Sequence, residues 1–101
     1  MSEKVYTLDE IRELIYERKD ELEKDYNAVT FFIFGSYARG EQTQESDIDF
    51  LVELKTPIGL MKLARLKFFL EELFNKKVDL GTPNSLKKLI KQQVLNEAVK
   101  L

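Results

Sequence analysis

Two aspartates and an upstream glycine-serine turn are the residues in this sequence whose types and spacing point to chemistry. Asp47 and Asp49 stand close together at the start of an apolar segment that is predicted to form a strand. Because side chains on a strand alternate between its two faces, these carboxylates point the same way and start about 6.6 Å apart. At that separation they can converge on cations held between them.

Two like charges at the start of an apolar strand repel each other and resist burial, so they need a counter-charge. Magnesium fits this role, because it prefers carboxylate oxygens together with substrate phosphates. A single aspartate at a strand start is more often an ordinary turn residue. The pair Asp47 and Asp49, preceded by the turn at Gly35 and Ser36, favours a metal site instead.

The turn at Gly35 and Ser36 follows an apolar run at 29–34 and is a candidate phosphate site. Glycine lets the backbone approach a phosphate closely, and the amides at a helix start attract anions. The Ser36 hydroxyl can also donate a hydrogen bond to a phosphate oxygen. Arg39 follows on the same turn, and two roles remain open for it: neutralising phosphate or bracing the loop.

Composition and local context exclude several other catalytic classes. The chain has no cysteine, which excludes disulfides, thiolate metal sites and cysteine nucleophiles. It has no histidine either, so Ser36 lacks the imidazole base of a serine triad and is not expected to be a nucleophile. Gly35 and Gly40 match the glycine spacing of a P-loop. That motif continues with lysine and then serine or threonine, but Glu41 and Gln42 follow here, so a P-loop is rejected.

The chain is predicted to fold as one domain over residues 1–101, of the α+β (mixed α/β) class. A capping box formed by Thr7 and Glu10 starts the first helix, which is predicted to run to about Tyr26. The elements that follow are a strand at 29–34, a helical turn at 36–39, a strand at 47–53, a helix at 58–74, a strand at 78–80 and a helical region from 82, in which apolar residues recur at helical spacing through 99. This order predicts a short three-stranded sheet with helices packed on it.

The helix predicted at 58–74 is apolar on more than one side, so it is either deeply buried or shares a face with a partner. Core packing is the default interpretation, and an interface is the alternative. Charge is also unevenly placed: residues 1–53 carry 6 basic and 14 acidic side chains, whereas residues 54–101 carry 10 basic and 4 acidic ones. The basic half could face phosphates or an acidic partner, although solvated helix faces also explain it.

The run G-S-x-A-R-G at 35–40, followed by S-D-I-D at 46–49 and a strand that continues F-L-V-E, resembles the DNA polymerase β-type nucleotidyltransferases. The small size points to their minimal branch, the MNT proteins that are often encoded beside HEPN-type toxins. The resemblance covers nearly the whole chain. It implies the nucleotidyltransferase fold, a mixed sheet, and a third acidic residue on the next strand that completes a metal triad. Asp79 is the one acidic residue in that predicted strand, although a lone aspartate there is more often a turn or an exposed edge.

The resemblance also implies an activity. A nucleoside monophosphate, expected to be AMP from ATP, would pass to a hydroxyl acceptor with release of pyrophosphate and the help of two Mg²⁺ ions, or Mn²⁺ in their place. Asp47 and Asp49 would bind both ions, and Asp79 would bind the ion that activates the attacking hydroxyl and could accept its proton. Such transfer relies on positioning and charge neutralisation, so it requires neither histidine nor cysteine.

The acceptor implied by the resemblance is a side chain of a HEPN-type toxin, which makes the chain a protein-adenylylating antitoxin. The alternative is an antitoxin without catalysis that neutralises its partner by direct contact. A nucleic-acid polymerase or tRNA-modifying enzyme fits less well, because no second domain can hold a template and the net charge is −2. No signal pattern or long apolar segment is present, so we expect a cytoplasmic protein without membrane contact. Base preference and oligomeric state, including a hetero-oligomer, remain open.

Overall fold

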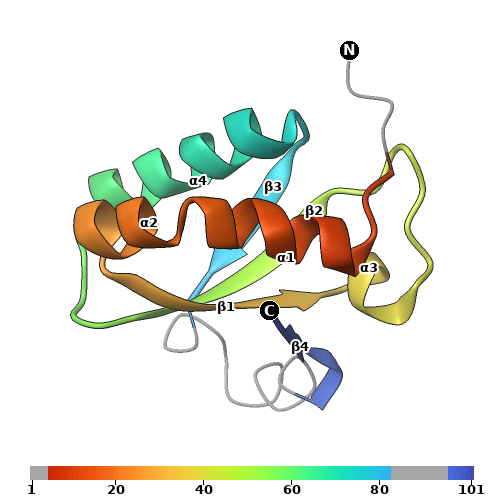
Figure 1. Cartoon of the computed structure of the whole chain (residues 1–101), viewed down its shortest axis with the longest axis horizontal. Helices are drawn as coiled ribbons and strands as arrows, with labels where there is room; N and C mark the ends of the chain where they lie inside the picture. The colour runs from red at the N-terminus through yellow and green to blue at the C-terminus, as the bar shows by residue number, and fades with distance from the viewer. Residues whose placement is uncertain (1–4, 83–95) are drawn as a thin grey trace.

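A computed structural model describes residues 5–82 and 96–101 of the chain, which form a sheet with helices packed on it (Figure 1). The elements in chain order are α1 (Leu8–Glu17), α2 (Lys19–Tyr26), β1 (Ala28–Phe34), α3 (Ser36–Arg39), β2 (Ile48–Leu54), α4 (Leu60–Phe74), β3 (Val78–Gly81) and β4 (Val99–Lys100). None of the helices in this part of the chain has the length and apolar composition that a membrane span requires.

The sheet is mixed, as the sequence resemblance implied, and its strand order is β3-β2-β1-β4. β1 pairs antiparallel with β2 and with β4, whereas β2 pairs parallel with β3. The expected number of three strands is wrong, because β4 adds a fourth. Val99 was predicted on the last helix but lies in this strand, which is too short to show a strand periodicity of its own. Of the rest of that predicted helix, residues 83–95 lie outside the described residues.

The first helix begins as predicted. Thr7 Oγ1 accepts a hydrogen bond from the Glu10 backbone amide at 3.1 Å, and the Glu10 carboxylate accepts one from the Thr7 amide at 3.0 Å. The prediction of one continuous helix to Tyr26 is wrong, because the helix is interrupted at Arg18, which separates α1 from α2. The Arg18 amide there donates to the Ile15 carbonyl, which is a tighter turn than an α-helix makes.

Helices α1, α2 and α4 lie together on one side of the sheet (Figure 1), where they cover the hydrophobic core. Ile48, Phe50 and Val52 of β2 are fully buried in this core. Because neighbouring residues on a strand face opposite ways, Asp49 points to the other face of the sheet. The apolar alternation of β2 therefore decides which face carries the candidate site.

The Phe50 ring joins the sheet to α4 at the centre of the core. Its centroid lies 5.9 Å from that of Phe31 on β1 and 5.6 Å from that of Phe74 on α4. Tyr6 closes the same cluster, because its ring meets Phe74 edge-on at 5.4 Å and its hydroxyl donates to the Phe74 carbonyl at 2.8 Å. These aromatic contacts hold α4 against β2.

Truncation of Phe50 should therefore destabilise the fold strongly. Phe50 is 0% exposed, and Phe50→Ala should lower the free energy of unfolding by about 3–5 kcal/mol, through lost burial and the cavity left behind. Phe68→Ala is the matched control, because Phe68 is 63% exposed on α4 and its loss should change stability by about 0.5 kcal/mol or less. Urea unfolding followed by circular dichroism measures both values, and equal losses would contradict the core assignment.

Candidate active site

Asp49 and Asp79, two of the three predicted carboxylates, lie side by side on neighbouring parallel strands. The register pairs Asp49 of β2 directly with Asp79 of β3. Both side chains lie on the sheet face opposite the helical core, and paired residues on adjacent strands are only about 4.8 Å apart. Asp79 is exposed and Asp49 is half-buried, so a ligand in solvent can reach this pair.

The closeness of these carboxylates in the strand register has an electrostatic consequence. Burial, a hydrogen bond with Asp79, and repulsion from Asp79 and Asp47 together raise the pKa of Asp49 to about 6. The positive charge of Arg39 acts in the opposite direction. Asp49 is therefore the focus of negative charge on this face, and a cation placed beside it would relieve the repulsion.

Asp47 lies outside the strand on which the sequence predicted it. It was predicted to start the second strand, but β2 begins at Ile48, so Asp47 lies at the end of the preceding loop. Within residues 5–82 and 96–101, no group of three acidic side chains forms a ready set of metal ligands. The structure thus brings Asp49 and Asp79 together with Asp47 nearby, and a metal triad of all three stays a prediction.

Gly35 lies directly against the Asp49 carboxylate. Phe34, the last residue of β1, pairs with Asp49, so the chain turns into α3 beside it. A Cβ atom at Gly35 would collide with the Asp49 carboxylate oxygen Oδ2 and lie 3.2 Å from its Cγ. The Gly35 φ and ψ angles of 74° and −148° also fall in a region that is essentially reserved for glycine. The predicted phosphate turn therefore meets Asp49, one of the predicted metal-binding carboxylates, at Gly35.

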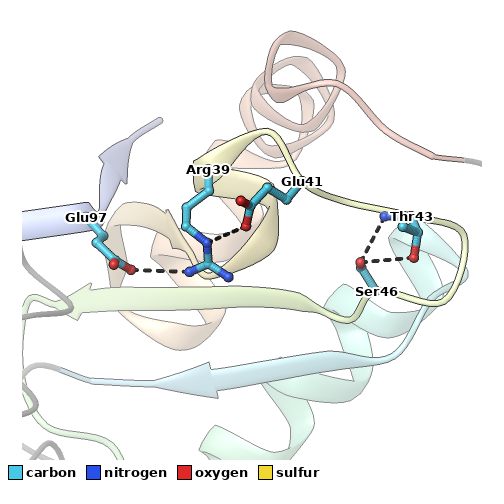
Figure 2. Close-up of polar contacts among 5 residues, drawn as sticks. All are labelled: Arg39, Glu41, Thr43, Ser46 and Glu97. Atoms are coloured by element: carbon cyan, nitrogen blue, oxygen red, sulfur yellow. Dashed lines mark hydrogen bonds and ion pairs between the residues drawn. The ribbon is translucent and has the colours of Figure 1, made fainter.

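Arg39 of α3 braces the loop that follows it and the end of the chain, as Figure 2 shows. Its Nε donates to the Glu41 carboxylate at 2.8 Å, and its Nη1 donates to the Glu97 carboxylate at 3.4 Å. The hydrogen bond to Glu41 is the main cause that raises the pKa of Arg39. Of the two roles left open by the sequence, bracing is the one that these contacts show, and phosphate binding stays a prediction.

The loop between α3 and β2 is held by its own hydroxyls just before Asp47. The Ser46 hydroxyl accepts a hydrogen bond from the Thr43 amide at 2.9 Å, and the two hydroxyl oxygens lie 3.4 Å apart (Figure 2). The Ser46 amide donates to the Thr43 carbonyl at 3.1 Å. This compact turn fixes the direction in which the chain enters β2.

Lys76 is a residue of the site region that the sequence did not single out. It is only 8% exposed, and its ammonium group donates to the Gln44 carbonyl at 2.8 Å. This contact ties the turn before β3 to the loop before β2, so it joins the two segments that lead to Asp79 and Asp49. The sequence carries no signal for this burial, because Lys76 and Lys77 are adjacent residues of the same type and only Lys76 is buried in the structure. A pocket of about 460 Å³ lies alongside, lined by Gln44, Glu45, Ser46, Asp47, Glu71, Asn75, Lys76 and Lys77.

The known proteins that this chain resembles are nucleotidyltransferases. Residues 12–101 match the nucleotidyltransferase domain family. Protein adenylyltransferase MntA of Thermococcus cleftensis is 39% identical over 93 residues, which cover 92% of this chain and 94% of that protein. A candidate protein adenylyltransferase of Methanocaldococcus jannaschii is 49% identical over 80 residues, 79% of this chain and 82% of that protein.

Solved structures of similar fold point the same way. A structure described as a candidate minimal nucleotidyltransferase superposes with a TM-score of 0.78 at 36% identity, covering 95% of this chain and 97% of that one. A crystal structure of the toxin–antitoxin MntA-HpeT superposes with a TM-score of 0.69 at 25% identity, covering 96% of this chain and 72% of that one. The chain belongs to the nucleotidyltransferase domain family, and within it to the minimal branch that the sequence resembled. It is thus a nucleotidyltransferase, and the predicted family, fold and enzyme class are confirmed.

The contact between Gly35 and Asp49 predicts different outcomes for two glycine substitutions. Gly35→Ala should abolish nucleotidyl transfer, because the new methyl group must displace the Asp49 carboxylate. Gly40→Ala is the matched control, since Gly40 also has a positive φ, of 72°, but no atom lies within 4 Å of its Cβ position. The control should lose about 1–2 kcal/mol of stability and keep its transfer rate. Transfer rates measured at a temperature at which both variants are folded test this prediction, and an active Gly35→Ala variant would contradict it.

The raised pKa of Asp49 predicts how pH affects the protein in the absence of divalent cations. A carboxyl group whose pKa rises from 3.8 to about 6 holds its proton more tightly in the folded state. Its contribution to the free energy of unfolding is complete below about pH 4 and is lost as the pH rises through about 6. Asp49→Asn removes this titration, so the variant should gain stability relative to wild type over that range. Urea unfolding in EDTA measures the difference in the free energy of unfolding between wild type and Asp49→Asn. If this difference does not change with pH, the raised pKa is not that of Asp49.

Proposed function

We propose that this chain transfers AMP from ATP to a hydroxyl group on a protein, and that the acceptor is a HEPN-type toxin which the transfer inactivates. The observation that carries the proposal is the contact of the Gly35 turn with the Asp49 carboxylate, beside Asp79 on the next strand. It puts a candidate phosphate site and a candidate cation site in one place. The names of the relatives support a protein as the acceptor. The proposal includes a single domain over residues 1–101 that works in the cytoplasm.

Divalent cations are part of the proposal. Burial and then the neighbouring Asp79 and Asp47 carboxylates raise the pKa of Asp49, and a bound cation would relieve the repulsion among these groups, so the residues fit Mg²⁺ or Mn²⁺. Asp49 and Asp79 would hold the ions, with Asp47 contributing from the end of its loop. When bound, two such ions would neutralise charge on the triphosphate and on the attacking and leaving oxygens.

The side chains themselves would bind ATP and handle the proton. The Ser36 hydroxyl and the amides after Gly35 would donate to the phosphate oxygens. The acceptor oxygen forms its bond to the α-phosphorus, and the bond from that phosphorus to the oxygen bridging to the β-phosphate breaks. The electron pair leaves with pyrophosphate, and the hydroxyl proton passes to the Asp79 carboxylate, which is exposed and therefore open to an incoming protein.

A second candidate function is neutralisation by contact alone. It is favoured by the exposure of large apolar side chains on α4, where Leu60 is 85% exposed and Met61 is 76% exposed. Such residues are typical of a protein interface. They do not explain why Gly35 lies against the Asp49 carboxylate beside Asp79 on the other face of the sheet, so transfer remains the leading proposal.

The two functions separate in a double variant. Asp47→Asn with Asp49→Asn removes the charges that would hold the cations but barely changes shape, and loss of their repulsion should leave the fold at least as stable. The enzyme is incubated with labelled ATP, Mg²⁺ and the HEPN-type toxin that is its proposed acceptor. Wild type should add nucleotide mass to that protein. The double variant should bind it without modifying it, and should fail to protect cells that express it.

Asp20→Asn with Asp25→Asn is the matched control, because it makes the same change of charge at two exposed positions of α2. It should transfer AMP and protect cells as wild type does. Full protection by the Asp47 and Asp49 double variant, with a toxin of unmodified mass, would refute the enzymatic proposal and support neutralisation by contact.

A further inference from the structure

Helix α4 carries an apolar face that the core does not use. Leu60, Met61 and Phe68 are 85%, 76% and 63% exposed, and Ala64 is exposed between them. Residues four positions apart lie above one another on a helix, so these side chains form one continuous strip over the first turns. We call this set of four residues the α4 stripe. The opposite face of the same helix is fully buried, at Leu66, Leu70 and Phe74.

Positive charges flank the α4 stripe. Lys62, Arg65 and Lys67 are the only charged residues between 60 and 70, and the first carboxylate of α4 comes at Glu71. Among the ion pairs of the described residues, none engages these three cations. An apolar centre with a basic rim fits a partner surface that is apolar in the middle and carries carboxylates around it.

The position of α4 in the fold limits further which kind of partner can bind the α4 stripe. α4 packs beside β3, the edge strand that carries Asp79 (Figure 1). The stripe lies on the helical side of the sheet, and Asp79 lies on the other face. The proposed function requires an acceptor that reaches Asp79, and a folded protein docked on the stripe can reach it around the β3 edge, whereas a flat bilayer cannot. A contact between the α4 stripes of two copies would bring three cations from each together, which is unfavourable.

We propose that the α4 stripe is the docking surface for the protein that accepts AMP, and that it binds an apolar patch of this acceptor rimmed by carboxylates. The inference rests on the proposed function, because it assumes a protein acceptor. It adds to that function a binding surface that is separate from the reacting groups. The stripe holds the acceptor while its hydroxyl reaches the site beside Asp79.

The test uses a variant of the stripe, Met61→Ser with Phe68→Ser, and a matched control, Tyr16→Ser. Tyr16 is also a surface aromatic, 58% exposed on α1, but lies outside the stripe. AMP transfer to the proposed HEPN-type acceptor is measured over a range of acceptor concentrations. The stripe variant should raise the KM for the acceptor about tenfold or more and leave kcat within about twofold. Its affinity for ATP with Mg²⁺ should equal that of wild type, and Tyr16→Ser should change none of these values.

The outcomes distinguish this inference from the function on which it rests. If wild type transfers AMP and the stripe variant shows an unchanged acceptor KM, the docking surface is refuted and the proposed function stands. If wild type transfers no AMP to the protein, both proposals fall.

Two further measurements test the other occupants directly. Wild-type chain that sediments with phosphatidylglycerol vesicles, when the stripe variant does not, would assign the stripe to a membrane surface and overturn the proposal. Wild type that elutes as a dimer on size exclusion, when the stripe variant elutes as a monomer, would assign it to a second copy and overturn it equally.

Discussion

The alternation of side chains along β2 is the constraint on which the rest of the structure depends. Ile48, Phe50 and Val52 enter the core, so Asp49 must face the other way. Pairing with β1 then brings Gly35 against its carboxylate, and pairing with β3 brings Asp79 beside it. The site is thus assembled by strand register.

The core in turn protects this register. A slip of β2 by one residue would carry Asp49 into the apolar core and move Ile48 and Phe50 out of it, so the mispaired sheet is strongly disfavoured. The aromatic contacts between Phe50 and its neighbours on β1 and α4 oppose such a slip. The apolar face therefore supplies the free energy that keeps mutually repelling carboxylates close together on the opposite face.

Local patterns in the sequence were enough to predict the parts of the fold that local interactions determine. The Thr7 capping box, the apolar strands and the glycine turn after β1 all depend on residues close together in the chain. The break at Arg18 has no glycine or proline to mark it, and β4 is too short to leave a pattern. The burial of Lys76 and the contact of Arg39 with Glu97 arise from segments that only the tertiary fold brings together.

The separation of the two sheet faces has an evolutionary consequence. Stability resides largely on the helical face, whereas the reacting groups have little part in the core. A lineage that loses a carboxylate by drift keeps its helices, its strand pairing and the exposed side of α4. Such a descendant would still fold and associate, and selection could retain it for binding alone. The architecture thus provides a short mutational path from an enzyme to a pseudoenzyme that requires no redesign of the scaffold.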